Sequence, residues 1–227
     1  MKSLIIFGTA EIAELAYFYF TNDSDYEVVA FTVDDEFVDN DSLLGLPVIP
    51  FSEITNKFPP EENAMHVALS YSKLNQLRQE KYKQAKGSGY KLASYICSKS
   101  VIWNDLETGE NCFILENQTI QPTVKIGNNV MLWSGNHIGH GTVIRDHAYV
   151  SSHVVIAGHC IIGNRCFLGI NSTIKDFTTV GDDCFVAMDA SVINDLGDGS
   201  VVLGASCDTF KYDDKRARII KRKYFGI

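Results

Sequence analysis

The sequence predicts a chain of two unlike halves, a small α/β domain followed by a parallel β-helix. In the first hundred residues, short apolar runs alternate with segments whose apolar residues have helical spacing, which is typical of a parallel sheet covered by helices. From about Ile102, an aliphatic residue recurs at every sixth position, which is the repeat of a β-helix. These patterns predict an α/β domain at 1–98, a β-helix at 99–202 and a C-terminal capping segment at 203–227.

The α/β domain is expected to be Rossmann-like. Its first strand ends at Gly8, its second strand ends in Asp34 and Asp35, and its last helix is closed by Gly87 and Gly89. Strands are predicted at 3–8, 26–35 and 65–70, and helices at 10–20 and 73–89. Because strands alternate with helices, we expect the strands to pair in parallel.

The β-helix is predicted from twelve consecutive aliphatic residues spaced six positions apart. They are Ile126, Leu132, Ile138, Ile144, Val150, Ile156, Ile162, Leu168, Ile174, Val180, Val186 and Val192. Each hexad forms one short strand and a corner, three hexads close a coil, and the aliphatic residues fill its interior. Residues 18 apart therefore stack, as Cys166 and Cys184 do at the small-residue position. Core packing is thus the expected role of most of the cysteines.

The composition argues against several classes of partner. The chain is 45% apolar, which supports a normal core, and its net charge of −8 argues against nucleic acid. It has no run of 18 apolar residues and no signal sequence, so we expect a cytoplasmic protein without a membrane partner. Six cysteines without a CxxC pair fit neither a disulfide scaffold nor structural zinc. The basic residues gather in "KYDDKRARIIKRK", either as a solvated segment or as a contact to ligand phosphates.

The two halves together resemble the left-handed β-helix, hexapeptide-repeat acetyltransferases that modify nucleotide sugars of the bacillosamine and perosamine type, with sialic acid O-acetyltransferases as relatives. The resemblance covers nearly the whole chain and rests on "IIFGTAEIAELA", "VVAFTVDDE", "LLGLPVIPFSEI" and "VVLGAS". It implies a left-handed helix, which is an exception to the right-handed rule for parallel crossovers. It also implies acetyl-CoA as cosubstrate, a nucleotide-linked amino sugar as acceptor, and a homotrimer with active sites between neighbouring β-helices.

Five of the six histidines lie close together in the sequence, between residues 137 and 159. His147, His153 and His159 share one hexad position, so they are expected to point from three different faces of the coil. No two histidines are 18 residues apart, so none should stack directly. Because a metal site needs several ligands about 2 Å from one ion, no metal is expected.

The resemblance assigns the chemistry to His140, since "GNHIGH" aligns with a histidine-bearing loop of the family. A neutral imidazole there is suited to accept the proton of an attacking amine near pH 7. Gly158 lies 18 residues further on, where the resemblance implies a backbone N–H that binds the acetyl oxygen and stabilises an oxyanion. The alternative is that His140 is an interface histidine without a chemical role.

Two positions depart from the family pattern. Relatives carry an acidic residue after the catalytic histidine, where this chain has Gly141, so Asn136, His137 or a carboxylate of a neighbouring chain is expected to orient His140. A second histidine of the family corresponds to Tyr149, and His153 either substitutes for it or is an ordinary surface histidine.

The nucleotide site is expected at the first turn of the α/β domain. Gly8, Thr9 and Ala10 place backbone N–H groups at a helix N-terminus, which suits a diphosphate, although a purely structural turn is the alternative. The absence of a GxGxxG pattern argues against NAD or FAD. By resemblance, Asp34 or Asp35 lies near the base or ribose. Relatives have glycines and a histidine where this chain has "AEI" at 10–12, so the choice among UDP, dTDP and GDP stays open.

The expected function is an acetyl-CoA-dependent N-acetyltransferase that acts at C4 of a nucleotide-linked 4-amino-4,6-dideoxy sugar for surface polysaccharide assembly. Direct attack is expected, because no cysteine has the context of an acylated nucleophile. The first alternative is a sugar O-acetyltransferase, and the second is a β-helix sugar-binding module without catalysis. The sequence leaves open the sugar stereochemistry, the acylated position and the size of the acyl group.

Overall fold

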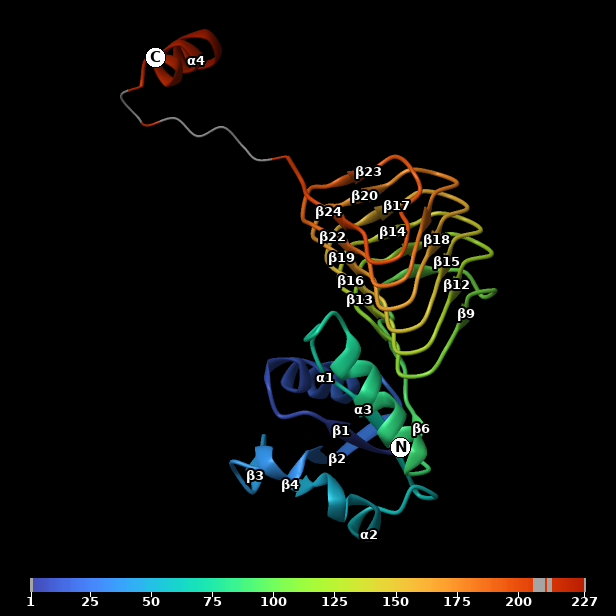
Figure 1. The fold of residues 1–227 in the computed structure, drawn as a ribbon. Helices are drawn as coiled ribbons and strands as arrows, with labels where there is room; N and C mark the ends of the chain where they lie inside the picture. Colours follow the sequence, from blue (N-terminus) through green and yellow to red (C-terminus); the bar gives the residue numbers. More distant parts are fainter. Residues whose placement is uncertain (1, 206–210, 212–213, 227) are drawn as a thin grey trace.

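The computed structural model of the chain describes residues 2–205, 211 and 214–226. Figure 1 shows an α/β domain, a β-helix that rises from it, and a short C-terminal helix. This is the two-part architecture that the sequence predicts, an α/β domain followed by a left-handed parallel β-helix. None of the described helices is both long and apolar enough to cross a membrane.

The α/β domain holds one six-stranded sheet in the order β3-β4-β2-β1-β5-β6, in which only the β3–β4 pair is antiparallel. Its strands are β1 (Lys2–Phe7), β2 (Tyr26–Val33), β3 (Ser42–Leu43), β4 (Leu46–Pro50), β5 (Asn63–Val67) and β6 (Lys91–Leu92). Its helices are α1 (Glu11–Asn22), η1 (Asp35–Phe37), η2 (Phe51–Glu53), α2 (Ile54–Lys57) and α3 (Gln76–Gly87). The three predicted strands are confirmed as β1, β2 and β5, with β3, β4 and β6 added at the edges.

Helix α3 fixes the α/β domain to the β-helix through a buried arginine. The Arg78 guanidinium donates hydrogen bonds to the backbone carbonyls of Asn129 and His147 and to Oδ1 of Asn75. Asn75 in turn donates its amide to the carbonyl of Arg165 at 3.1 Å. Burial lowers the pKa of Arg78 to about 10, which still leaves it charged at neutral pH. Carbonyl and amide oxygens therefore hold this cation and set the orientation of the two domains.

The β-helix consists of two-residue strands that stack into three parallel sheets. The first sheet contains β7 (Tyr95–Ile96), β10 (Phe113–Ile114), β13 (Met131–Leu132), β16 (Tyr149–Val150), β19 (Phe167–Leu168), β22 (Phe185–Val186) and β24 (Val201–Val202). The second contains β8 (Val101–Ile102), β11 (Thr119–Ile120), β14 (His137–Ile138), β17 (Val155–Ile156), β20 (Thr173–Ile174) and β23 (Ser191–Val192). The third contains β9 (Glu107–Thr108), β12 (Lys125–Ile126), β15 (Val143–Ile144), β18 (Ile161–Ile162) and β21 (Thr179–Val180).

The predicted hexad pattern is confirmed by both register and burial. Strands pair at a separation of 18 residues, as His137 does with Val155. All twelve predicted interior residues belong to one buried cluster that runs along the helix axis. Three of the cysteines expected at small-residue positions, Cys160, Cys166 and Cys184, lie in the same cluster. Cys207 lies outside the described residues.

The last coil of the β-helix is shorter than the others and ends in exposed apolar residues. Phe185 pairs with Val201 at a separation of 16. Val201 and Leu203 are 64% and 74% exposed. The C-terminal helix α4 (Lys215–Phe225) is drawn apart from this coil in Figure 1. The predicted capping role of 203–227 therefore stays a prediction, since part of that segment is outside the described residues.

Candidate active site

The three histidines that share a hexad position lie at the three corners of the coil. His147, His153 and His159 each have a left-handed backbone, with φ of 64°, 58° and 57°. Each follows a strand of a different sheet, so the three side chains leave the helix at different edges. Among the described residues, no group of three His, Cys, Asp or Glu side chains could hold a metal ion. His147, His153 and His159 are thus dispersed over three corners, as the hexad spacing predicts, whereas His140 and His159 lie in ring contact although no direct contact between histidines is expected.

His140 is exposed and is oriented by Gln121, one coil below it. Gln121 Oε1 accepts from the His140 backbone N–H at 2.9 Å and lies 3.0 Å from Nδ1 of the same residue. An oxygen that accepts from a backbone N–H can interact favourably with Nδ1 only if Nδ1 carries a proton. The neutral ring then has its lone pair on Nε2, which is the atom available as a base. Gln121 is not among the site residues predicted from the sequence.

Gly158 lies against the ring of His140. A Cβ atom placed on Gly158 would be 2.9 Å from Cε1 of His140 and 3.2 Å from Nε2, so only glycine leaves room for the ring. The carbonyl of Gly158 accepts from Phe177 N at 3.0 Å, whereas its N–H meets no acceptor among the described residues. Gly158 therefore brings a backbone donor that lacks a partner among the described residues to the side of the imidazole, and the 18-residue spacing predicts this contact between Gly158 and His140.

His159 lies against Gly141, the residue that follows His140. A Cβ atom on Gly141, whose φ is 67°, would lie 2.5 Å from Nδ1 of His159. The His159 ring meets His140 edge to face at a centroid distance of 4.8 Å and stacks on Phe177 at 4.9 Å. A side chain at 141 would have to displace the His159 ring and would adopt a strained backbone conformation, whereas Gln121 already holds His140 in place.

The other predicted contacts of His140 have different surroundings. Asn136 is buried, donates its amide to the carbonyl of Trp133 and accepts from Val154 N at 2.7 Å. His137 lies half-buried on the outer side of β14, between Thr119 and Val155 in the register. His153 is exposed and packs over Gly135 at another corner. No hydrogen bond joins these three side chains to His140 within the described part of the chain.

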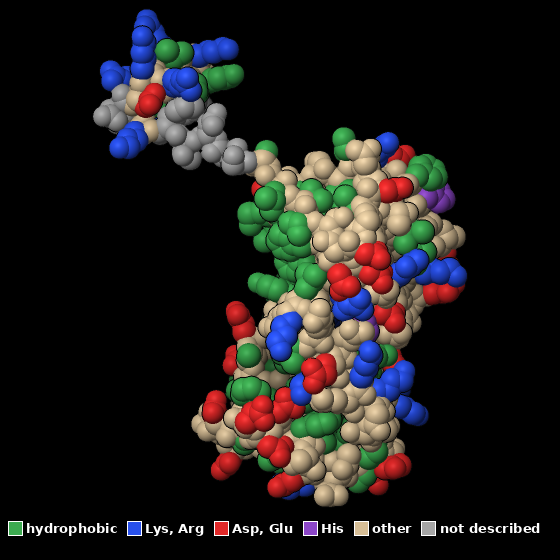
Figure 2. All heavy atoms as spheres, in the orientation of Figure 1, with side chains coloured by type: hydrophobic (Ala, Val, Ile, Leu, Met, Phe, Trp, Pro, Cys, Tyr) green, Lys and Arg blue, Asp and Glu red, His purple; other side chains and the backbone are tan. Residues whose placement is uncertain are grey.

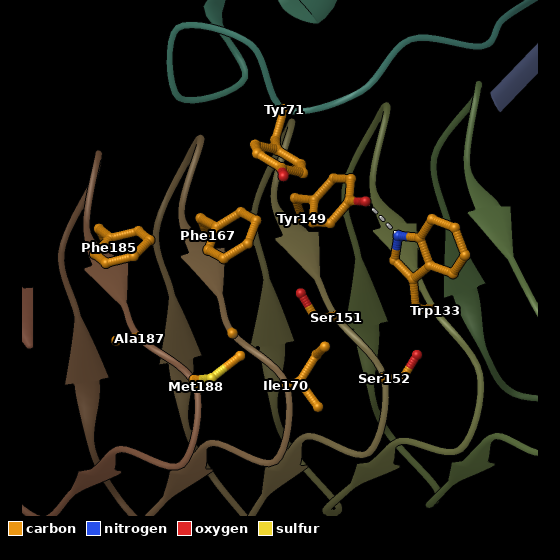
Figure 3. A pocket seen from close by; sticks show the side chains of 11 residues that line it. Tyr71, Trp133, Tyr149, Ser151, Ser152, Phe167, Ile170, Phe185, Ala187 and Met188 are labelled. Atoms are coloured by element: carbon orange, nitrogen blue, oxygen red, sulfur yellow. Dashed lines mark hydrogen bonds between the residues drawn. The ribbon is translucent and has the colours of Figure 1, made fainter. Parts of the chain in front are cut away.

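Two adjoining cavities lie where the first sheet of the β-helix meets the α/β domain. One has about 620 Å³ and is lined by Tyr71, Trp133, Tyr149, Phe167, Phe185 and Met188 among others (Figure 3). The other has about 760 Å³, shares Tyr71, Trp133 and Tyr149, and reaches Ala10 and Glu11 at the start of α1. Figure 2 shows hydrophobic side chains gathered on this side of the upper coils. The cavities form an apolar trough with polar groups near α1.

Tyr149 lies at the centre of this trough. Its ring stacks on Phe167 at 5.3 Å and meets Tyr71 edge to face at 5.1 Å. Its hydroxyl accepts a hydrogen bond from Trp133 Nε1, and burial raises its pKa to about 12. Tyr149 therefore stays a neutral phenol and cannot act as a base at neutral pH. The other aromatic residues of this row are not among the residues predicted from the sequence, although they recur near one hexad position.

Within one chain, His140 and the trough lie on opposite sides of the β-helix. The trough lies on the outer side of the first sheet, which contains β16 and β19. Gly141 and His159 form the corner between the second and third sheets. In a triangular coil, a corner between two sides lies opposite the third side. A site that uses both His140 and the trough must therefore combine two copies of the chain.

The predicted nucleotide-site residues are divided between different surroundings. Gly8 is buried, with φ of 127°, and a Cβ atom there would lie 2.8 Å from the carbonyl oxygen of Ala68, so sheet packing alone requires glycine. Thr9 borders a cavity of about 130 Å³, whereas Ala10 opens onto the 760 Å³ cavity.

Both predicted aspartates have partners inside the α/β domain. Asp34 accepts from Lys81 Nζ at 2.7 Å. Asp35 accepts from the backbone N–H and the hydroxyl of Ser52 at the start of η2, and these hydrogen bonds lower its pKa. Each carboxylate thus has a structural role inside the α/β domain, in addition to the nucleotide contact that its position after β2 predicts.

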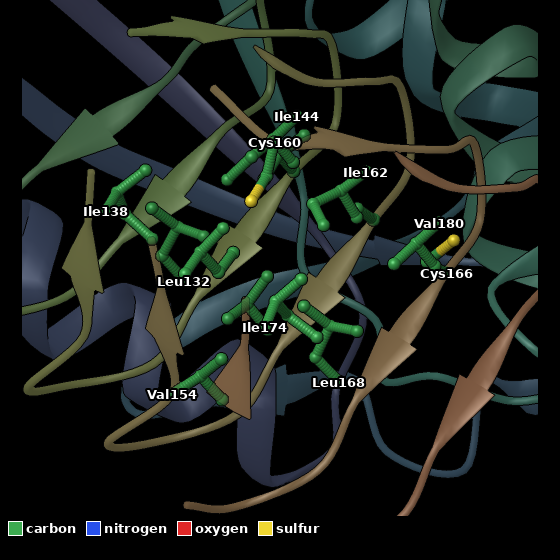
Figure 4. Packing of buried hydrophobic residues seen from close by; sticks show 14 of the residues in the cluster. Leu132, Ile138, Ile144, Val154, Cys160, Ile162, Cys166, Leu168, Ile174 and Val180 are labelled. Carbon is green, nitrogen blue, oxygen red and sulfur yellow. The ribbon is translucent and has the colours of Figure 1, made fainter. Parts of the chain in front are cut away.

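The cysteines of the β-helix are buried and are unsuited to nucleophilic catalysis. Figure 4 shows Cys160 and Cys166 among the aliphatic side chains of the interior. Burial raises the pKa of Cys112 to about 11 and that of Cys166 to about 12. Because the thiolate is the reactive form, these thiols are inert at neutral pH.

Comparison with known proteins supports the repeat and the fold. Residues 123–158, which include both His140 and Gly158, match the bacterial transferase hexapeptide (six repeats). No curated protein sequence matches the chain. Among solved structures, the chain is similar to a perosamine N-acetyltransferase from Caulobacter crescentus in complex with CoA and GDP-perosamine, with a TM-score of 0.78, 20% identity, and coverage of 90% of this chain and 98% of that chain.

Two further structures have the same fold. The acetyltransferase domain of PglB from Neisseria gonorrhoeae has a TM-score of 0.77 at 19% identity, with coverage of 90% of this chain and 100% of that chain. The same domain is known in complex with acetyl coenzyme A. WeeI from Acinetobacter baumannii has a TM-score of 0.71 at 17% identity, with coverage of 90% and 97%. At such identities the likeness shows a shared fold.

Proposed function

We propose that the chain is an acetyl-CoA-dependent N-acetyltransferase whose acceptor is a nucleotide-linked amino sugar, with the 4-amino group of a 4,6-dideoxy sugar as the acylated position. The main support is the arrangement around His140, where an imidazole held by Gln121 lies against Gly158, whose backbone N–H meets no acceptor in the described part of the chain. The fold adds support, since similar structures contain CoA with GDP-perosamine or acetyl coenzyme A.

His140 acts as the general base in this proposal. Gln121 accepts the Nδ1 proton, so Nε2 takes the proton of the acceptor amine as its nitrogen attacks the thioester carbonyl. Holding the ring in one orientation and one tautomer means that no reorganisation is needed when the proton moves. A free carboxylate at 141 is not required for this role.

Gly158 stabilises the charge that develops on the carbonyl oxygen. Its N–H donates to the oxyanion of the tetrahedral intermediate, and its lack of a side chain lets the thioester approach the main chain. As the C–S bond breaks, the protonated His140 returns its proton to the departing thiolate sulfur. The products are the N-acetyl sugar and CoA, and no acyl-enzyme forms because the described thiols of the helix interior are buried.

The acceptor lies in the apolar trough of the neighbouring copy. The sugar ring packs on Trp133 and Tyr149, and the diphosphate approaches the backbone N–H groups of the first turn of α1 at Ala10, which borders the same cavity. Asp34 and Asp35 mark the edge of this nucleotide site at the end of β2. Because His140 and the trough are on opposite sides of one helix, three copies arranged head to tail make three complete sites, which supports a homotrimer.

This assignment suggests a place in the cell. Both substrates are water-soluble and charged, so we place the enzyme in the cytoplasm, where it supplies an N-acetylated sugar for surface polysaccharide assembly. Glu11 also borders the 760 Å³ cavity, where it either contacts the sugar or repels a phosphate, so the choice among UDP, dTDP and GDP stays open.

The first prediction concerns His140→Ala. Transfer from acetyl-CoA to UDP-, dTDP- and GDP-linked 4-amino sugars is followed by detection of the released thiol. With the best acceptor, loss of the base lowers kcat by about 100-fold or more. Asn117→Gly serves as the control, since Asn117 is an exposed corner residue with φ of 60° at another edge of the helix.

A His140→Ala variant with the kcat of the wild type contradicts the assignment of the base. Activity of the wild type on a hydroxyl acceptor but on none of the amino sugars indicates an O-acetyltransferase instead. A calorimetric titration that detects no binding of acetyl-CoA removes the acetyltransferase proposal and leaves a sugar-binding module.

A further inference from the structure

Helix α4 has a charge opposite to that of the chain that precedes it. Its range from Lys215 to Phe225 contains six Lys and Arg residues, and no Asp or Glu occurs from Lys215 to the end of the sequence. The chain as a whole has a net charge of −8, so the remainder is strongly acidic. Figure 2 shows the basic side chains of α4 gathered apart from the body of the molecule.

The β-helix has few cations of its own. From Lys99 to Ala205 the sequence has five Lys and Arg residues against eleven Asp and Glu residues. Three of the five are engaged in ion pairs, Lys125 with Glu107 at 3.1 Å, Arg145 with Asp182 at 3.9 Å and Arg165 with Asp183 at 2.6 Å. Between Arg165 and Lys211, Lys175 is the sole cation in the sequence.

This shortage conflicts with the chemistry of the donor in the proposed function. Coenzyme A carries a diphosphate and a ribose phosphate at the end of a long pantetheine arm. A thioester held at His140 would thus place several negative charges along an acidic helix. Repulsion by the aspartates of the last coils would weaken binding unless other cations lie close to the phosphates.

We propose that α4 supplies these cations and binds the phosphates of the nucleotide-bearing thioester. Nine residues separate Ala205 from Lys215, and an extended segment of that length spans about 30 Å, which allows α4 to return to the coils of its own or a neighbouring chain. Arg216, Arg218 and Arg222 provide guanidinium groups, which bind phosphate oxygens in pairs. The inference rests on the proposed function, because it names the part of the donor that α4 binds.

The apolar residues of α4 fit the same placement. Ala217, Ile220 and Tyr224 follow the helical spacing that puts them on one side, and Ile220 and Tyr224 are 43% and 68% exposed. The last coil of the β-helix presents the exposed Val201 and Leu203 directly before the segment. If the apolar side of α4 packed on Val201 and Leu203, the basic side chains of α4 would lie beside the phosphates.

The test compares donors with and without phosphates in the full-length chain. Arg218→Gln, Lys221→Gln and Arg222→Gln are combined in one variant, and Lys2→Gln, Lys83→Gln and Lys91→Gln form a control with the same change of charge on exposed residues of the α/β domain. Binding of CoA is measured by calorimetry, and KM is measured for acetyl-CoA and for acetyl-pantetheine. We expect the α4 variant to raise the Kd of CoA and the KM of acetyl-CoA about tenfold or more, with no change for acetyl-pantetheine.

Equal CoA affinity in the α4 variant and the control overturns the inference. Binding to vesicles is measured by sedimentation. The inference is also overturned if the wild type binds phosphatidylglycerol vesicles but not phosphatidylcholine vesicles, and the α4 variant loses this binding while its CoA affinity is unchanged. That result assigns α4 to a membrane surface. Normal use of acetyl-pantetheine in either case shows that the acetyltransferase proposal still stands. Absence of CoA binding and of transfer in the wild type overturns both proposals.

Discussion

At the scale of single residues, the proposed base His140 is oriented by a glutamine, Gln121, and not by a carboxylate. Gln121 accepts from both the backbone N–H and Nδ1 of His140, so one neutral oxygen fixes the position and the tautomer of the ring. A carboxylate would fix the ring equally well but would also favour its protonated form. A neutral partner such as Gln121 does not add this electrostatic stabilisation of the imidazolium.

Variants at Gln121 test this role. Gln121→Ala removes the acceptor, so kcat falls about tenfold or more as the ring samples other orientations. Gln121→Glu keeps the acceptor and restores activity at high pH, but the acid limb of its pH profile moves to higher pH, because a carboxylate stabilises the imidazolium. The measurement is kcat against pH for the wild type and both variants. An unchanged kcat in Gln121→Ala shows that another group orients His140.

The sequence could predict that His140 and Gly158 lie together, but not that Gln121 contacts His140, for a physical reason. The hexad rule relates residues 18 apart, which stack in register, and Gly158 follows His140 by that separation. Gln121 precedes His140 by 19 residues, so its contact depends on a long side chain that reaches across the step between coils. The ring contact between His140 and His159 likewise joins residues 19 apart.

At the scale of elements, the β-helix is the most predictable part because each coil repeats the same environment. Every strand has one residue inside and one outside, so a period of six fixes both burial and register. The α/β domain is less regular. The predicted helix at 73–89 begins at Gln76, since Lys73, Leu74 and Asn75 take positive φ values that let Asn75 bond to the β-helix. That contact involves residues 90 positions apart and leaves no local signal.

Two neighbouring residues of one strand provide a matched test of the repeat. Ile156 is fully buried in the helix interior, whereas Val155 in the same strand is 42% exposed. Ile156→Ala is expected to lower the free energy of unfolding by about 2–5 kcal/mol, since it leaves a cavity in a packed core. Val155→Ala is expected to change it by about 0.5 kcal/mol. Urea denaturation at one protein concentration measures both, and equal losses contradict the assignment of inside and outside.

At the scale of the whole molecule, the geometry of one chain shows why several copies are needed. The apolar trough lies along one side of the triangular helix, and His140 lies at the opposite corner. The sequence indicates shared sites only through its resemblance to a trimeric family, because repeats alone do not say which side of a coil faces a partner. The three-sheet arrangement supplies the physical reason for sharing.

The most direct test of the account is complementation between two inactive chains. His140→Ala removes the base, and Ser70→Trp fills the 760 Å³ cavity that Ser70 borders. The two variants are co-expressed with different tags, and assemblies that contain both are purified through both tags. A head-to-tail trimer of mixed composition has one site with an intact corner and an intact trough, so we predict about a third of the wild-type activity. Mixed assemblies as inactive as either variant alone contradict a site shared between chains.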